Sequence, residues 1–567
     1  MTASRSPWSF LDEYRGKEFS GEWPTLPETF RITASRHGSR PCFTVFEPDR
    51  VTLSYDEALL RVRAVSRWLH ARGIGKGHSV AVTGKNSPEW AVAYLGVLFA
   101  GATVVPIDYQ LKNEEIDLLM KTADVRILFV DEEKHERWAS SPGALEAVIS
   151  LRKGIGSYVY DLDGPEAAIE EAKEDDLAAI LFTSGTTGSP KGVMLTHKNF
   201  ISDCFLAQTN LTLYPTDVFY ALLPIHHSYT MLAVFIEALS VGAELVFGKK
   251  MVTKAILKEL KEARITMFLG VPMLFNKVLA GIMRGIKAKG PAAYWLIRAL
   301  MAISGFIKSV FKVNPGKKMF HSVLDKASLA TIRICISGGG PLAPSVFKQY
   351  NELGLDFIQG YGLTETSPIL TLNPVEHFKV KSVGRLSEQV RMKIVDPDER
   401  GVGEIVVQGP MVMKGYYKMP EETAEAFTQD GWLKTGDLGY LDSENYLYLT
   451  GRAKNLIVTE GGKNVYPEEI ENEFQLYDEI DQILVRGYEA DRKLKVEGIE
   501  ALVFPNAEAF KGKDGAAKPK AAVTERIEAI VAEVNQRLMP YQKIEKVSVL
   551  DEAMEMTTTK KIKRTAS

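Results

Sequence analysis

The chain has 567 residues, of which 45 % are hydrophobic and 25 % are charged, as is typical of globular proteins. This composition excludes a disordered, collagen-like or low-complexity protein, and the length predicts several domains' worth of polypeptide. Lys and Arg total 69 against 72 Asp and Glu, so no overall basic excess points to nucleic acid as a partner.

The cysteines and the first residues of the chain indicate a reducing compartment. Cys42, Cys204 and Cys335 are scattered and form no CxxC or Cys/His cluster, which argues against disulfides and structural zinc. The first residues lack the apolar core of a secretory signal. We therefore expect a cytoplasmic protein.

Helical and strand patterns alternate along the first part of the chain. Residues 54–70 have the spacing of an amphipathic helix, and residues 78–82 read as a strand. Residues 90–107 carry no charge and are long enough to cross a membrane, but Gly101 interrupts them before a β-branched run. We expect a helix, a glycine turn and a buried strand there. The same order returns in residues 230–248, as in parallel α/β sheets.

Residues 277–326 differ, because they carry ten Lys or Arg and one acid, Asp325. They contain an apolar helical segment, 293–311, with Arg298 and Lys308 inside it. Two charges argue against a membrane-spanning helix. One interpretation is a helix packed on the core with a solvated basic face. The other is a basic amphipathic helix that lies on an anionic membrane surface.

A polar loop at 170–176 precedes a buried strand at 177–183. The pattern changes in the last third of the chain, because from about residue 380 short β-branched runs between Gly, Asp and Asn predict antiparallel strands. Residues 453–567 predict a small α+β domain after a large domain of residues 1–452. The final residues, TTTKKIKRTAS, show no apolar pattern and are expected to form a mobile tip.

The strongest local signal is LFTSGTTGSPKGVMLTH at 181–197, where a buried strand runs into a loop of Gly, Ser and Thr. Such a loop can place backbone N–H groups around a polyphosphate, because glycines remove the Cβ atoms that would block close approach. It is not a Walker A motif, since Pro190, Lys191 and Gly192 stand where that motif requires Gly and Lys-Ser/Thr.

Residues 183–192 resemble the phosphate loop of the adenylate-forming superfamily, which includes acyl-CoA synthetases, peptide-synthetase adenylation domains and luciferases. Five further segments resemble motifs of that family, in the same order: GGGPL (338–342), GYGLTE (360–365), GWLKTGDL (431–438), GRAKNLIVTEGGKNVYPEEI (451–470) and KKIKR (560–564). The resemblance implies an α/β fold. Its large N-terminal domain would have two αβ subdomains and a small β-barrel-like part, and a small α+β domain would follow.

The resemblance also implies roles for individual residues. Glu365 would ligate Mg²⁺, as oxygen ligands suit this ion, and Thr364 would touch the α-phosphate. Asp437 and Arg452 would hold the ribose, and Tyr361 would stack on adenine. The implied ATP-binding residues are Thr183, Ser184, Gly185, Thr186, Thr187, Gly188, Lys191, Gly338, Gly339, Gly340, Gly360, Tyr361, Gly362, Asp437 and Arg452.

The resemblance of the C-terminal motifs implies a catalytic lysine and a rotation of the C-terminal domain. Lys561 matches the catalytic lysine, although Lys560 stands where the family has Gly. Lys454 matches the hinge about which the C-terminal domain rotates, and Gly461 and Gly462 would line a pantetheine tunnel.

Two adjacent histidines, His226 and His227, follow the pattern of the family's acyl-pocket motif. They are expected to gate the substrate carboxylate or to be packed structurally. No neighbouring acid or Cys in the sequence gives them metal-ligand spacing, so no metal is expected there.

The motifs look most like those of bacterial medium- to long-chain fatty acyl-CoA synthetases. The expected reaction uses ATP and Mg²⁺ to form acyl-AMP and pyrophosphate, and then transfers the acyl group to coenzyme A. An acyl-acyl carrier protein synthetase and a fatty acyl-AMP ligase are alternatives, and so is a degenerate nucleotide- or acyl-binding module. The expected partners are small molecules, with a peripheral membrane contact as an open question.

Overall fold

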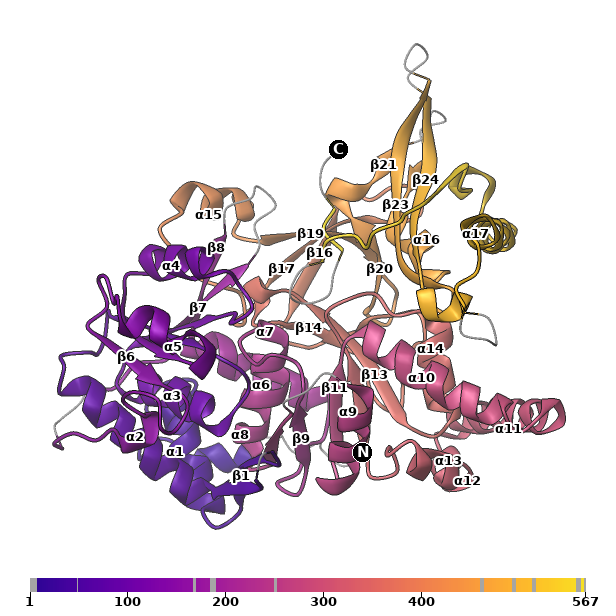
Figure 1. Cartoon of the computed structure of the whole chain (residues 1–567). Coiled ribbons are helices and arrows are strands. Elements are labelled where there is room, and N and C mark those ends of the chain that lie inside the picture. The colour runs from indigo at the N-terminus through magenta and orange to yellow at the C-terminus, as the bar shows by residue number, and fades with distance from the viewer. Residues whose placement is uncertain are drawn as a thin grey trace.

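The structure of the chain is a computed structural model, shown in Figure 1. It describes residues 8–47, 49–166, 170–183, 190–248, 252–458, 463–491, 496–511, 516–556 and 562–564.

The first sheet has seven strands, and its central strands are parallel. Their order is β18-β8-β7-β4-β3-β5-β6. The helix α3 (Pro88–Phe99) covers this sheet and is buried along almost all its length, which explains why the sequence around it carries no charge. The strands are β3 (Ser79–Thr83), β4 (Thr103–Ile107), β5 (Val125–Val130), β6 (Ala147–Ser150), β7 (Leu177–Thr183), β8 (Lys191–Thr196) and β18 (Gly415–Tyr416).

The second sheet has thirteen strands in the order β16-β17-β19-β20-β15-β14-β13-β12-β11-β9-β10-β1-β2. Its parallel part consists of β1 (Pro41–Val45), β9 (Val218–Ala221), β10 (Glu244–Phe247), β11 (Met267–Gly270), β12 (Ile334–Ser337) and β13 (Asp356–Gly362). The hairpin strand β2 (Val51–Ser54) closes one edge. An antiparallel arm extends the other edge through β14 (Ile369–Leu372), β15 (Gly384–Leu386), β20 (Tyr446–Arg452), β19 (Leu433–Leu441), β17 (Gly403–Gln408) and β16 (Arg391–Val395).

The N-terminal strand β1 joins this second sheet across a long stretch of sequence. It pairs in parallel with β10, and the Thr44 hydroxyl donates a hydrogen bond of 2.6 Å to Glu244, 200 residues away. The two sheets are therefore not two consecutive blocks of the chain.

Residues after Arg452 form a third unit with a sheet and a hydrophobic cluster of its own. In Figure 1 it rises above the end of the antiparallel arm. Its elements are β21 (Ile457–Val458), β22 (Asn464–Val465), α16 (Pro467–Asn472), β23 (Ile480–Asp491), β24 (Val496–Pro505), α17 (Lys520–Asn535) and β25 (Lys546–Val549).

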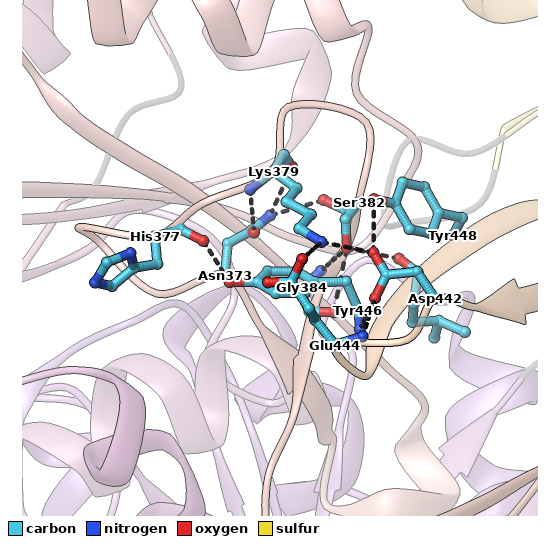
Figure 2. A network of polar contacts seen from close by, with 10 residues as sticks. Asn373, His377, Lys379, Ser382, Gly384, Asp442, Glu444, Tyr446 and Tyr448 are labelled. Carbon is cyan, nitrogen blue, oxygen red and sulfur yellow. Dashed lines mark hydrogen bonds and ion pairs between the residues drawn. The ribbon is translucent and has the colours of Figure 1, made fainter. Parts of the chain in front are cut away.

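A polar network fastens the loop after β14 to the β19–β20 turn (Figure 2). The Lys379 ammonium lies 2.8 Å from carboxylate oxygens of both Asp442 and Glu444. The Asn373 side chain donates to the carbonyl of Ser382 at 2.7 Å. These contacts tie the loop after β14 to the hairpin of β19 and β20, which lies inside the antiparallel arm.

Most of the predicted elements are confirmed. The expected helix at 54–70 is α2 (Tyr55–His70), which begins after a capping box at Ser54. The expected strand at 177–183 is β7, and residues 230–248 form a helical stretch followed by β10.

The expected mobile tip is wrong for residues 562–564. The Arg564 guanidinium donates to both carboxylate oxygens of Glu471 at 2.6 Å and to the carbonyl of Val485 at 2.8 Å. These charge-assisted hydrogen bonds anchor residues 562–564 to α16 and β23. Burial raises the pKa of Glu471 to about 7, while the charge of Arg564 acts in the opposite direction.

The helix predicted at 293–311 exists as α11 (Pro291–Phe311), but the expectation of a solvated basic face is wrong. Its two charged side chains point inward. Arg298 bonds to Gln349 at 2.9 Å, and Lys308 pairs with Asp356 at 2.7 Å. The charged groups are turned toward partners in the neighbouring helix and strand, so the outer face keeps only uncharged side chains.

Candidate active site

The candidate site lies where β7 and β13 end at their carboxyl ends. In parallel α/β sheets ligands bind at this edge. Thr183, the last residue of β7, is paired with Lys191, the first residue of β8. The two ends of the phosphate loop are therefore held side by side. Ser184, Gly185, Thr186, Thr187 and Gly188 lie outside the described residues.

Tyr416 joins this loop to the predicted magnesium ligand. Its hydroxyl donates a hydrogen bond of 3.0 Å to Oε1 of Glu365, and the Lys191 ammonium lies 4.9 Å from the centre of its ring. The strand pairing of β18 with β8 brings Tyr416 beside Val193. Tyr416 thus contacts the Lys191 ammonium through its ring and the Glu365 carboxylate through its hydroxyl, close to where the phosphate loop begins and ends.

The donors around Glu365 suit a magnesium ion. Glu365 is half-buried, and its backbone carbonyl accepts a hydrogen bond from the N–H of Met413, so its position is fixed. The hydroxyls of Thr364 and Ser228 lie 3.0 Å apart. Hard oxygen donors with room for water and phosphate oxygens are what Mg²⁺ prefers. A magnesium ion held by Glu365 would neutralise charge on the phosphates.

Two glycines allow close approach near the predicted adenine side. A Cβ on Gly338 would lie 2.7 Å from the ring of Tyr229, and a Cβ on Gly362 would lie 1.4 Å from the carbonyl oxygen of Pro368. The Tyr229 hydroxyl donates to the carbonyl of Ile336 at 3.1 Å. Any larger residue at Gly338 would displace Tyr229. Gly339 and Gly340 follow on the same turn, and Gly360 precedes Tyr361 on β13.

The predicted ribose residues are brought together by strand pairing. Asp437 on β19 is the direct cross-strand neighbour of Arg452 on β20. The Arg452 Nε lies 2.7 Å from Oδ1 of Asp437, and the Tyr361 hydroxyl donates to Oδ2 at 2.7 Å. Burial, and secondly the charge of Asp437, raise the pKa of Tyr361 well above its usual range, so this hydroxyl stays protonated as a donor.

Lys454 lies beside this pair in a short 3₁₀ turn, Ala453–Asn455, that follows β20. Partial burial lowers the pKa of its ammonium, and the charges of Arg452 and Arg564 act in the same direction. Lys454 lies at the junction of the large sheet and the C-terminal unit, and its role as a hinge stays a prediction. Gly461, Gly462 and the predicted catalytic Lys561 lie outside the described residues.

The C-terminal unit docks on the turn after β12. The Gln475 side chain accepts a hydrogen bond of 2.8 Å from the N–H of Ala343 and donates one of 3.0 Å to the carbonyl of Pro341. The GGGPL segment therefore contacts the C-terminal unit as well as the sheet that carries the site.

His226, which is buried, and His227, which is half-buried, lie beside Asp108, an acid far from them in the sequence. His226 Nε2 lies 3.6 Å from Oδ2 of Asp108, and the rings of His226 and His227 are 4.2 Å apart. A potential metal-binding group can therefore form here across distant parts of the chain, although residue spacing gave no sign of it. His227 directly precedes Ser228, which contacts Thr364.

The sequence missed Tyr416, Tyr229, Ser228 and Gln475. Each of them contacts a residue at least 51 positions away in the sequence. Ser228 and Tyr229 had a local signal, because they follow the two histidines directly, whereas Tyr416 and Gln475 had none.

Comparisons with known proteins give a consistent result. The family described as AMP-binding enzyme matches residues 30–417. The feruloyl-CoA synthase of an Amycolatopsis species is 30 % identical over 481 residues, covering 82 % of this chain and 85 % of that protein. The long-chain-fatty-acid–CoA ligase FadD15 of Mycobacterium bovis is 29 % identical over 553 residues, covering 90 % of this chain and 89 % of that protein.

Among solved structures, ATP-bound MatB from Rhodopseudomonas palustris is similar over most of its length. The TM-score is 0.73 at 27 % identity, and the match covers 95 % of this chain and 97 % of that one. The predicted α/β fold, with a large N-terminal domain and a smaller C-terminal domain, is confirmed by this similarity.

Proposed function

Since this chain belongs to the AMP-binding enzyme family, whose similar members include acid–CoA ligases, we propose that it activates a fatty acid with ATP and passes the acyl group to coenzyme A. One observation carries the proposal. Lys191, Tyr416 and Glu365 converge at the phosphate loop, while Asp437 and Arg452 pair on the neighbouring strands.

The first half-reaction forms a mixed anhydride. A carboxylate oxygen attacks the α-phosphorus of ATP, the bond between the α-phosphorus and the bridging oxygen breaks, and pyrophosphate leaves with the electron pair. Negative charge grows on the phosphates, so catalysis requires cations and N–H donors at that place. Lys191 and the phosphate loop would hold the β- and γ-phosphates, and Thr364 would contact the α-phosphate. Glu365 would hold Mg²⁺, and Lys561 would bridge the carboxylate and the α-phosphate.

In the second half-reaction a thiolate of coenzyme A attacks the acyl carbon and AMP leaves. We propose a boundary between residues 452 and 453, with rotation about Lys454 between the two steps. The proposed rotation would break the docking of Gln475 on Pro341 and Ala343, because that contact joins the two parts across the hinge. Gly461 and Gly462 would then line the path of the pantetheine arm.

An alkyl acid is favoured by the apolar character of the helical stretch that follows the two histidines. Residues Met231–Ile236 form a π-helical turn, and all their side chains are apolar and buried. Such turns are frequent at functional sites. Each CH₂ buried in an apolar pocket contributes about 0.8 kcal/mol. The similarity to a long-chain ligase over nearly the whole chain supports the same class.

An aromatic acid is the second candidate, because a feruloyl-CoA synthase matches at similar identity. The test is release of pyrophosphate and AMP from MgATP with acetate, benzoate, ferulate, octanoate and palmitate, each with and without coenzyme A. AMP and thioester that form only with a fatty acid and coenzyme A together support the proposal. Thioester formation with ferulate but with no fatty acid would show that the substrate is an aromatic acid. Pyrophosphate release without any thioester would favour an acyl-AMP ligase or a carrier-protein acceptor.

The catalytic lysine has its own test. Lys561→Ala should lower adenylation by about 100-fold or more while thioester formation from preformed acyl-AMP survives. Lys563→Ala is the matched control, because Lys563 lies two residues away and its ammonium pairs only weakly with Glu555 at 3.4 Å. Equal losses in both variants would contradict the assignment of Lys561. No turnover of any acid by the wild type would favour the binding-module alternative.

A further inference from the structure

The helix α11 presents an apolar face to solvent. Every exposed residue between Pro291 and Phe311 is uncharged. The Trp295 and Phe306 side chains are 70 % and 63 % exposed, and the large exposed residues of this face are Trp295, Leu296, Ile303, Phe306, Val310 and Phe311. Large exposed apolar patches mark surfaces that bind another body.

The helix cannot turn this face inward, because its charged side chains hold the opposite face. Lys308 is buried and bonds to Asp356, Asn351 and the carbonyl of Leu355 at 2.7, 2.8 and 3.1 Å. Gly305 faces α14 (Pro344–Glu352) so closely that a Cβ there would lie 2.7 Å from Glu352. The orientation of α11 is therefore fixed by its packing on the core.

Lysines flank the apolar face at both ends of the helix. No Asp or Glu occurs from residue 263 to residue 324. Lys287 and Lys289 are exposed just before the helix, and Lys312 and Lys318 are exposed just after it. Figure 1 shows α11 projecting from the body of the molecule at the end of α10 (Pro272–Lys287). An apolar strip between basic residues at both ends is the pattern of a helix that lies in the interface of an anionic membrane.

By length and composition alone, the helix is long and apolar enough to cross a membrane, and little of it is buried in the protein. Spanning would require Lys308 and Arg298 to leave their partners in the core, which costs far more than lying on the surface. The aromatic pair Tyr294 and Trp295 stands near its N-terminal end, and such residues are enriched at membrane interfaces.

We propose that α11 docks this protein on an anionic lipid surface, with Trp295 and Phe306 inserted at the level of the headgroups. A second copy of the chain is a poorer occupant. A two-fold contact through this strip would bring the lysine-rich ends of two helices together without any acidic residue of the same segment to pair with them. The inference does not depend on which acid the enzyme activates.

The first experiment measures co-sedimentation of the full chain, without nucleotide or acid, with vesicles of phosphatidylcholine alone or mixed with phosphatidylglycerol. We expect binding to the anionic vesicles, at least about fivefold weaker binding to the neutral ones, and weakening by salt. Trp295→Gln with Phe306→Gln should weaken binding by about tenfold or more. The control pair is Leu60→Gln with Leu118→Gln, which replaces side chains that are 69 % and 53 % exposed on α2 and α4 (Asn113–Thr122) and should bind as the wild type does.

A second measurement keeps the test valid if the double variant misfolds. The three native cysteines are free and buried, so a Phe306→Cys variant can be labelled selectively with a polarity-sensitive dye. Its emission should shift to the blue on anionic vesicles, while the same label in Leu60→Cys should not respond. Unchanged vesicle binding in the Trp295/Phe306 variant overturns the proposal. So does a wild type that ignores vesicles but sediments as a dimer that the same variant dissociates.

Discussion

Tyr361 and Asp437 are joined by a hydrogen bond of 2.7 Å from the tyrosine hydroxyl to Oδ2, although 76 residues separate them. The other carboxylate oxygen faces Arg452 at 2.7 Å. The buried Asp437 is therefore oriented from both sides before any nucleotide arrives. A ribose would have to use the remaining lone pairs of a carboxylate that is already positioned, which costs little ordering on binding.

Asp437→Asn should raise the KM for ATP by about 10- to 100-fold, because a charged acceptor is lost and Arg452 keeps no anionic partner from this strand pair. Tyr361→Phe removes only one of the two donors and should raise it by less than about tenfold. Exchange of labelled pyrophosphate into ATP measures both. A larger effect for Tyr361→Phe than for Asp437→Asn would contradict the assigned ribose role.

Glu365→Gln should lower the adenylation rate by about 100- to 1,000-fold, since the shape is kept but the anionic ligand is lost. The same variant should require more Mg²⁺ for half-maximal rate. Tyr416→Phe leaves the carboxylate in place and should cost about tenfold. If Glu365→Gln leaves the Mg²⁺ dependence unchanged, Glu365 is not the ligand.

His197 gives a stability change on acidification. It is buried, its Nδ1 accepts a hydrogen bond from the N–H of Leu26 at 3.2 Å, and burial lowers its pKa from 6.5 to about 4. The unfolded chain therefore binds the proton first, so stability is lost as the pH falls below 6.5. The loss should be about 2 kcal/mol at about pH 5. Urea unfolding of the wild type and His197→Gln at about pH 7 and pH 5 measures it, and the variant should lose less.

Glu237 should have the opposite effect on the pH dependence of stability. Burial raises its pKa from 4.5 to about 8, against a hydrogen bond of 2.7 Å from Gln208. The folded state keeps the proton, so this group destabilises the fold progressively as the pH rises above 4.5. Glu237→Gln should therefore stabilise the protein, by about 3 kcal/mol more at about pH 8 than at pH 5. A gain that does not grow with pH would show that Glu237 is ionised in the folded protein.

Lys454→Pro tests the proposed hinge. Proline fixes φ and disfavours the turn conformation of the residue before it, so the chain should be held near one arrangement. We expect one half-reaction to fall by more than about tenfold while the other stays within about threefold. The half-reactions are measured separately, by pyrophosphate exchange and by thioester formation from acyl-AMP. Equal losses in both would indicate general damage rather than a blocked rotation.

Local patterns were enough to predict many elements of the fold. Ser54 and Glu57 form a capping box that marks the start of α2, and the apolar run of β7 lies between polar stretches of the sequence. Such signals depend on neighbours in sequence, which is why their positions could be predicted within a few residues.

The site could be predicted only where a motif holds its own residues. Glu365 was found, but Tyr416, which bonds to it from 51 residues away, was not, because its role depends on the pairing of β18 with β8. The prediction of a solvated basic face on α11 was wrong for a related reason. A count of Lys and Arg gives the charge of a segment, but the face on which Arg298 and Lys308 lie depends on partners in α14 and β13.

The pairing of β1 with β10 has a consequence for the newly made chain. A ribosome adds about 5–20 residues per second, so the 200 residues between Thr44 and Glu244 take about 10 to 40 seconds to follow. The strands β3 to β8 can assemble in that interval, whereas β1 and β2 emerge earlier but can join the large sheet only after β10 has emerged. The apolar residues of β1, among them Phe43 and Val45, must wait for β10 to emerge, and chaperones have that interval in which to bind them.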